Sequence, residues 1–459
     1  MRSAQSKYGY GMTLSACLWL GLFPLLGGSY AHITYNKWNI MLILTGITLP
    51  CFLFDLVRDR ILNKEPGRKL LLRDVFPAII ASLHILWILI TCLLCTGSYD
   101  PDVWWRGKPV HYEGLASQLC YFSLFICFFF SRVHLKPVLL SAAAGVAVFF
   151  AIVMLQRSGE NPLGLYPPGR SYAKNPEFQG TIGNIDMGTG YLLLLAGLFL
   201  YALLSNLPKF HASNNSRQTS SLLPPTSTLR PPTSYLLPVS IAFLLSLYLI
   251  ITMDVQFGVI SLAVLFLVTL LRFIPKKYRL LVFILLIIAV LLVVWFWPLY
   301  GGGIWELHEI LHGRIRLSFG SDRIAVWYYS LLLSGESLLT GGGSGTFASR
   351  FNHFIQENNL IIPAEQDGHP LPNVFDAPHS EYLNQLVNHG LPALILFVLL
   401  LLLSIFRKHD RCLPLLTPCS AAVLCYAIQG IFSYPVCLVA PMFWILLALS
   451  FTMPTESKG

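Results

Sequence analysis

The sequence predicts an all-α fold, a polytopic integral membrane protein with about 12 transmembrane helices and a large extracytoplasmic loop between helices 9 and 10. Of its 459 residues, 55% are hydrophobic and only 12% are charged, and the mean hydropathy is +0.64. An average soluble domain carries about 25% charged residues. We therefore interpret residues 1–459 as a single membrane domain.

Twelve apolar runs have the length, about 17 residues or more, that is needed to cross the hydrocarbon core of a bilayer. They lie near residues 11–29, 39–54, 75–96, 115–131, 137–155, 187–206, 235–252, 255–271, 280–298, 390–406, 413–430 and 434–452. Each should be helical, because lipid offers no hydrogen-bond partner to backbone groups. The first run follows a basic start but precedes no A-x-A cleavage site, so we interpret it as a retained signal anchor.

Lysine and arginine residues are concentrated in alternate loops. The loop after the second run contains Arg58, Arg60, Lys64, Arg68, Lys69 and Arg73. Since basic loops stay on the cytoplasmic side, this pattern predicts that the N- and C-termini are both cytoplasmic. We attribute the net charge of +9 to this topology and to attraction for anionic membrane lipid. No nucleic-acid partner is expected, because no soluble segment carries a basic stripe with interleaved aromatic residues.

Few side chains inside the runs can titrate. His84 is the one residue within them that titrates near neutral pH, and we interpret it as a hydrogen-bonded packing residue. Cys92 and Cys95 have C-x-x-C spacing without a second pair or a histidine cluster, which favours packing over zinc or redox chemistry. Ion-coupled transporters place charged residues at membrane depth. Catalytic or binding charges are therefore expected in the loops.

Two loops differ from the rest in length and composition. Residues 206–234 are rich in Ser, Thr and Pro, which predicts a flexible cytoplasmic linker. Residues 299–389 form the longest loop, and it should contain amphipathic helices that lie on the bilayer or cover the bundle. One should begin at a cap, Ser321 or Asp322, and the next should follow the glycines near 341. Their apolar positions are Ile324, Trp327, Tyr328, Leu331 and Leu332 in the first helix and Phe347, Phe351 and Phe354 in the second.

His379 is the first candidate site residue. In PHSEYLNQLVNHG, Pro378 and His379 should open a helix. The positive end of the helix dipole disfavours imidazolium and leaves a neutral nitrogen available as a base, although Glu381 beside it could oppose this effect. The alternative is an ordinary histidine at a loop-to-helix junction, and the residues alone leave both open.

Several outer cations and turns are weaker candidates. Arg323 stands near a helix start, where a cation adds no stability, so it could instead hold phosphate oxygens in a bidentate fork, or it could be a solvated surface arginine. Arg170 breaks the positive-inside trend, which hints at an anionic ligand. Gly183-Asn184 predicts a turn. Asp100-Pro-Asp102 mimics a metal-binding D-x-D, but two carboxylates alone do not support a metal site.

Taken in order, these segments resemble the bacterial O-antigen ligase and O-antigen polymerase superfamily. GTIGNIDMGTGYL is similar to the family's G-T-x-G-N before a span, SDRIAVWYYSLLL with GGGSGTF to its R-x-x-x-W and G-x-G-x-G-T-F segments, and HSEYLNQLVNHGLPALILF to its H-N/S-x-x-L helix and the span that follows. The order and spacing agree over residues 180–406.

The resemblance implies roles for two residues. His379 corresponds to the histidine that activates the acceptor hydroxyl, and Arg323 to the arginine that engages the lipid diphosphate. It also implies a polyprenyl-diphosphate-linked glycan donor and a reaction that needs no metal and no cofactor. Many members carry a further arginine in a Ser-Arg-Gly turn, where this chain has Gln256. Its substitute could be Arg170, Arg314, Arg316 or Arg350, or the diphosphate could be held differently. Gln256, Asn184 and Glu381 are candidates for supporting the site.

The sequence thus favours an enzyme of the bacterial cytoplasmic (inner) membrane. It would transfer the lipid-linked glycan, at the outer face, onto an acceptor that is a glycan, a lipid core or a protein. A lipid-linked glycan flippase or exporter is the alternative, and it should use a charged central cavity. A non-catalytic assembly protein would have no need for His379.

Overall fold

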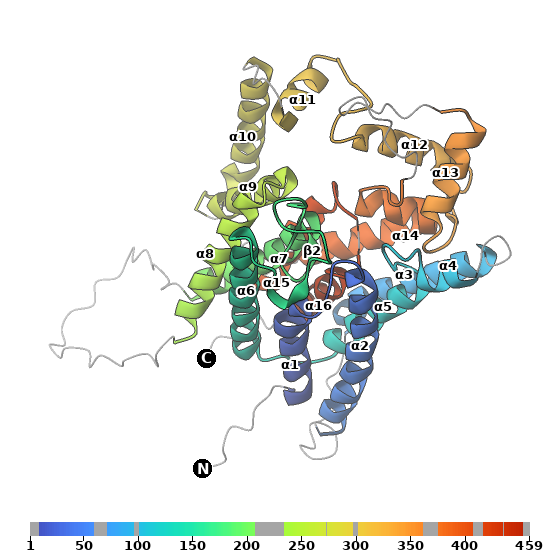
Figure 1. Ribbon diagram of the computed structural model, residues 1–459. Coiled ribbons are helices and arrows are strands. Elements are labelled where there is room, and N and C mark those ends of the chain that lie inside the picture. Colours follow the sequence, from blue (N-terminus) through green and yellow to red (C-terminus); the bar gives the residue numbers. More distant parts are fainter. Residues whose placement is uncertain are drawn as a thin grey trace, which may run out of the picture.

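The structure, a computed structural model, describes residues 9–58, 71–95, 101–206, 234–271, 273–296, 302–360, 375–406, 416–434 and 436–452 (Figure 1). Over these residues the chain is helical apart from loops and one short antiparallel pair, β1 (Phe178–Gln179) with β2 (Gly183–Asn184). The prediction of an all-α fold is confirmed.

In the part of the chain that the structure describes, six helices are long and apolar enough to cross a membrane by length and composition. They are α2 (Ile33–Val57), α3 (Leu72–Cys95), α6 (Leu135–Arg157), α7 (Ile185–Ser205), α10 (Lys276–Phe296) and α14 (Glu381–Ile405). Shorter apolar helices cover the other predicted runs. They are α1 (Tyr10–Cys17) with its π and 3-10 continuations to Leu25, α5 (Leu115–Phe129), α8 (Leu236–Thr252), α9 (Gln256–Leu271), α15 (Pro418–Gln429) and α16 (Ala440–Thr452). A helix thus lies over every predicted run, while the count of twelve spans stays a prediction.

Burial differs sharply between these helices. Helix α7 lies at the centre, packed against α8 and α15, and α16 packs against α5 (Figure 1). Helix α10 lies at the periphery, and Val294 is its one buried residue in the part of the chain that the structure describes. Its exposed Leu, Ile and Val side chains are what a lipid-facing helix requires.

Within the described residues, four shorter α-helices lie outside the predicted runs: α4 (Pro101–Arg106), α11 (Gly302–Leu311), α12 (Arg323–Gly335) and α13 (Phe347–Glu357). Helices α11 to α13 gather at one end of the bundle, uppermost in Figure 1. Asp322 occupies the N-cap position of α12, as predicted, but it has a left-handed conformation and makes no side-chain cap hydrogen bond. Tyr328, Leu331 and Leu332 stay exposed on α12, whereas Phe347 and Phe351 of α13 are buried.

The long helices contain charged residues near their ends, so they are longer than the charge-free runs of the sequence. Helix α2 buries Lys37 and Asp55 near its two ends. The Lys37 ammonium donates to the backbone carbonyls of Phe23 and Pro24, both at 3.0 Å. Cations satisfy the last carbonyls of a helix in this way, so Lys37 closes the end of the first apolar helix.

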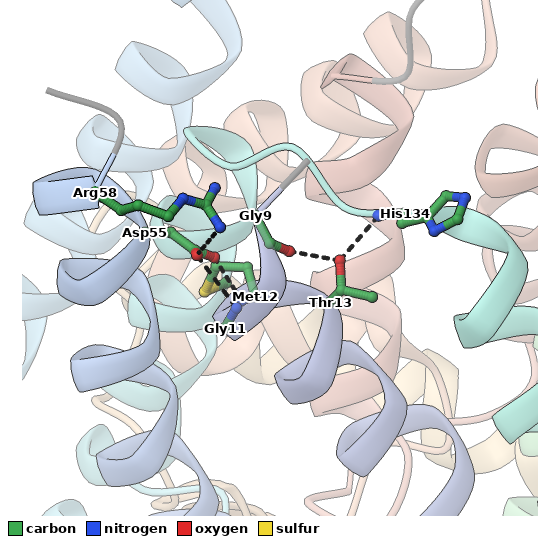
Figure 2. Close-up of polar contacts among 7 residues, drawn as sticks. All are labelled: Gly9, Gly11, Met12, Thr13, Asp55, Arg58 and His134. Atoms are coloured by element: carbon green, nitrogen blue, oxygen red, sulfur yellow. Dashed lines mark hydrogen bonds and ion pairs between the residues drawn. The ribbon is translucent and has the colours of Figure 1, made fainter. Parts of the chain in front are cut away.

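Asp55 belongs to a second polar group, which we term the α1 cap cluster: Gly9, Gly11, Met12, Thr13, Asp55, Arg58 and His134 (Figure 2). The Asp55 carboxylate accepts from the backbone N–H groups of Gly11 (3.2 Å) and Met12 (2.8 Å), and Arg58 lies 3.4 Å from the same carboxylate. Asp55 therefore acts as the N-cap of α1 from another helix.

Helix α14 is held by the glycine-rich turn that precedes α13. The backbone N–H groups of Gly342 and Gly343 donate to the carbonyls of Val387 and Asn388 at 3.1 and 2.8 Å. At Gly341, which has φ +66°, a Cβ atom would lie 2.5 Å from the Asn388 carbonyl carbon, so only glycine permits this approach. The turn is thus a backbone clamp on the first half of α14.

His84 of α3 forms a hydrogen bond of 3.2 Å with Gln385, in the half of α14 that the clamp holds.

The predicted linker 206–234 lies almost wholly outside the described residues, as do Asp100 and much of the basic loop after α2.

Candidate functional site

His379 lies just before α14 and does not open it as predicted. The helix starts at Glu381, because the Ser380 hydroxyl is the N-cap and accepts from the backbone N–H of Leu383. His379 itself has φ +49°, a left-handed conformation that cannot continue into a helix. Its side chain is half-buried at the N-terminal end of α14.

Three side chains lie around His379, and two of them come from distant parts of the chain. The Tyr434 ring lies edge-on to it, with the ring centroids 5.1 Å apart. His111 packs on the same tyrosine at 4.8 Å, and its Nε2 lies 3.1 Å from a carboxylate oxygen of Asp376. These residues come from the loop after α4, the segment before α14 and the loop after α15.

The surroundings keep the His379 imidazole neutral. Burial first, and then the positive charge of Arg323, lower its pKa to about 4, while Asp376 acts in the opposite direction. The pKa of His379 is therefore lowered, as expected, but the main cause is burial rather than a helix dipole. Burial alone would raise the pKa of Asp376, yet His111 and His379 hold it below its usual value. A neutral imidazole thus lies beside an ionised carboxylate.

Arg323, the first residue of α12, faces the start of α7. Its guanidinium lies 3.7 Å from the carboxylate of Asp186 and 4.9 Å above the Phe257 ring. One terminal nitrogen donates to the Gly320 carbonyl at 2.9 Å. Its Nε is buried without a hydrogen-bond partner among the residues that the structure describes. The guanidinium is held in place while part of its donor set stays available for an anion.

Strained backbone flanks these residues. Tyr112, beside His111, has φ +53°, and Ser321 and Asp322, directly before Arg323, have φ +55° and +64°. With His379 at +49°, four of the non-glycine residues with positive φ adjoin this group. Such conformations cost about 1–3 kcal/mol each and persist where the surroundings impose them, commonly at functional sites. We term His111, Asp186, Arg323, Asp376, His379 and Tyr434 the His379 cluster.

Two of the supporting candidates adjoin the cluster. The Asn184 side chain is the N-cap of α7 and accepts from the backbone N–H of Asp186 at 2.8 Å, so it orients the residue that pairs with Arg323. Glu381 is only 4% exposed and lines a small pocket beside the cluster. The pocket lies between the starts of α7 and α14 and the end of α15, and its walls are Asp186, Met187, Gly190, Glu381, Tyr426, Gln429, Gly430, Ser433, Tyr434 and Val439.

The other predicted cations lie elsewhere. Arg170 is exposed in the loop before β1, and no contact of the described residues joins it to Arg323. Arg314 forms a bidentate pair with Glu309 at 2.7 Å, Arg316 lies over the Trp305 ring, and Arg350 donates to the Val387 carbonyl in the α14 clamp. Gln256 is exposed at the start of α9, next to the phenylalanine beneath Arg323.

Within the described residues, no group of three or more His, Cys, Asp or Glu side chains could hold a metal ion. Asp102 is exposed and lies 3.8 Å from Arg106, within α4. The groups of the cluster themselves offer proton acceptance by a neutral imidazole and anion binding by a guanidinium.

Four members of the cluster escaped sequence reasoning: His111, Asp186, Asp376 and Tyr434. Asp186 carried a usable signal, because an acidic residue two positions after an N-cap Asn belongs to the first turn of a helix. His111, Asp376 and Tyr434 stand in loops without a motif, and their meeting depends on how α5, α14 and α16 pack.

The fold and the cluster define a helical membrane protein with a polar, partly buried site at the ends of its helices. Residues 241–398, which include Arg323 and His379, match the family model described as O-antigen ligase. This match confirms the resemblance to the O-antigen ligase and polymerase family over these residues. No curated protein and no solved structure matches the chain.

Proposed function

We propose that the protein is a glycosyltransferase that moves a polyprenyl-diphosphate-linked glycan onto an acceptor hydroxyl at the outer face of the bacterial cytoplasmic membrane. The acceptor belongs to a glycan, a lipid or a protein. One observation carries the proposal, namely that a half-buried imidazole kept neutral stands in the same cluster as a guanidinium with a free buried donor. The family match supports the transfer of glycan in envelope biosynthesis.

The proposed reaction assigns one task to each residue. His379 removes the proton of the acceptor hydroxyl as its oxygen attacks the anomeric carbon. The bond from that carbon to the diphosphate oxygen breaks, and its electron pair leaves with the diphosphate. Arg323 offsets the growing negative charge of this leaving group. Asp376 stabilises the imidazolium until it returns its proton to water.

The placement of the cluster fits a lipid-borne donor. His379 and Asp186 stand at the starts of α14 and α7, helices long enough to span a membrane, and the predicted topology places both starts on the outer side. A donor lipid in the bilayer carries its diphosphate at the headgroup level. Rigid helices would then present the base and the cation at that depth.

The test is transfer by purified protein in detergent from a polyprenyl-diphosphate oligosaccharide, with and without EDTA. His379→Ala and Arg323→Ala should each lower turnover by about 100-fold, the size typical of losing a general base or a charge clamp. His353→Ala and Arg314→Ala are the matched controls, because both side chains are mainly exposed and pair with carboxylates away from the cluster. These controls should keep wild-type turnover, and EDTA should not reduce it.

Two results would refute the transferase. Full activity in both cluster variants would remove the assigned roles. Movement of the intact donor across liposomes, without release of diphosphate, would favour the flippase or exporter.

A further inference from the structure

Two buried carboxylates lie close to each other beneath the His379 cluster, and only one of them is fully satisfied. Glu113 accepts from the Tyr121 hydroxyl at 2.6 Å with one oxygen and from the Gln118 amide at 3.3 Å with the other. Burial raises the pKa of Glu113 well above its usual value, and nearby Glu381 adds to the shift. Glu113 thus has a complete structural role.

One of the two carboxylate oxygens of Glu381 makes no hydrogen bond within the described residues. Its Oε1 accepts from the Gln385 amide at 3.1 Å, whereas Oε2 is buried without a hydrogen-bond partner within the described part of the chain. Leaving a buried acceptor unsatisfied costs about 1–3 kcal/mol or more. Packing does not demand this arrangement, because the backbone N–H of Glu381, which donates to the Gly430 carbonyl at 2.7 Å, already ties α14 to α15.

The unsatisfied carboxylate belongs to the wall of the small pocket, between the two halves of the proposed reaction. Asp186, on one side of the pocket, pairs with Arg323. Tyr434, on another, contacts His379. A group in the pocket would therefore be flanked by the proposed leaving-group site and the proposed base. The enclosed space suits about one water-sized group, such as a hydroxyl.

The lining selects the chemistry of this group. The lining contains no cation that could balance a phosphate, and the polar walls would be left unsatisfied by an acyl chain. Carboxylate, amide and hydroxyl groups next to tyrosine rings suit a hydrogen-bond donor on a sugar. Glu381 and Asp186 would accept from it, and Ser433 or Gln429 could donate to its oxygen.

We propose that this pocket binds one hydroxyl of the sugar ring that is attached to the diphosphate, with Glu381 Oε2 as its acceptor. This inference rests on the proposed function and adds a determinant of donor specificity. In a glycosyl transfer the ring gains oxocarbenium character, and hydrogen bonds to ring hydroxyls strengthen in the transition state. Glu381 would thus recognise the sugar and also favour its transfer.

Occupancy of the pocket can be measured without catalysis. In Ser433→Cys, a thiol at the pocket wall is labelled with a maleimide while polyprenyl diphosphate is added, either bare or carrying glucose, galactose, N-acetylglucosamine or N-acetylgalactosamine. Wild type, which lacks this thiol, gives the background. At least one glycosylated lipid should protect the thiol from the maleimide. The concentration that it needs should be about tenfold or more lower than the concentration of bare lipid that gives the same protection. Adding Glu381→Gln should abolish this difference.

Kinetics supply the second readout and a matched control. Glu381→Gln should lower kcat/KM for the preferred donor by about 10- to 100-fold, the loss expected when a buried polar group is left without its partner. Glu113→Gln changes the neighbouring buried carboxylate, and it should leave kcat/KM of the folded protein within about threefold of wild type.

The outcomes separate the two proposals. Equal protection by bare and glycosylated lipid, no protection by any of them, or equal losses in the two glutamine variants would overturn the sugar pocket while wild-type transfer still stands. Selective protection without any transfer would support the pocket and refute the transferase. If Glu381→Gln does not fold, selective protection in Ser433→Cys alone decides.

Discussion

The α1 cap cluster and the His379 cluster both pair an aspartate with an arginine, and they lie toward opposite ends of α2. Cys437 contacts the carbonyls of Thr34 and His111, which places the His379 cluster at the start of that helix, whereas Asp55 stands near its end. The Asp55 carboxylate is saturated by two backbone N–H groups and Arg58 (Figure 2).

The Asp186 and Arg323 pair is built differently. Its charged groups lie 3.7 Å apart, a buried donor is left over, and strained residues precede the arginine. The same residue types therefore serve stability where backbone groups satisfy them, and under the proposed function they serve binding where backbone groups do not. The two regions thus differ in whether the hydrogen-bonding capacity of their charged groups is used up, and not in the types of residue.

The largest expected effect tests the structural side of this contrast. Asp55→Ala removes the acceptor for two N–H groups of α1 and the partner of a mostly buried arginine. The free energy of unfolding in detergent should fall by about 2–3 kcal/mol, while transfer activity per folded molecule stays at the wild-type level. Asp102→Ala removes an exposed pair and should cost at most about 0.5 kcal/mol. A loss of activity without a loss of stability in Asp55→Ala would contradict the distinction.

The next effect concerns pH. Burial and Arg323 lower the pKa of His379 to about 4, so the imidazole is neutral and competent above about pH 5. The kcat/KM of transfer should therefore change little between pH 7.5 and pH 5.5, where a histidine with the ordinary pKa of about 6.5 would lose about 90% of its neutral form. Half-maximal activity near pH 6.5 would show that His379 is not held as described. Arg323→Gln should move the acidic limb of its residual activity upward.

The smallest effect measures backbone strain. At φ +49° glycine is favoured over alanine, so His379→Gly should be more stable toward unfolding than His379→Ala by about 1 kcal/mol. At His353, inside α13, the order should reverse, because glycine destabilises a helix interior by about 1 kcal/mol relative to alanine. The same order at both positions would exclude strain at His379.

The same contrast explains what the sequence could reveal. The apolar runs predicted where the helices lie, because a long hydrophobic stretch in a sequence has few other interpretations. The family motifs pointed to Arg323 and His379. The charge-free run excludes Lys37 and Asp55. The helix α2 nevertheless continues through both, because their buried side chains bond to backbone groups.

The remainder of the cluster depends on contacts far apart in the chain. His111 and Asp376 meet across more than half of its length, and neither stands in a periodic segment. Nor does the sequence distinguish the saturated Glu113 from the unsaturated Glu381. That difference follows from Tyr121 and Gln118, one to two turns further along, which supply both of the partners of Glu113.

The backbone clamp on α14 bears on how such a protein can diversify. Gly342 and Gly343 hold Val387 and Asn388 through main-chain atoms, and the N–H of Leu391 donates to the Leu338 carbonyl at 2.8 Å. The first half of α14 is thereby held through main-chain atoms, independently of the side chains that line the pocket. Under the proposed function, replacements at positions such as Ser433 or Gln429 could accumulate over generations and retune the accepted saccharide, while the helix that carries the proposed base keeps its place and the lineage never passes through an inactive ancestor.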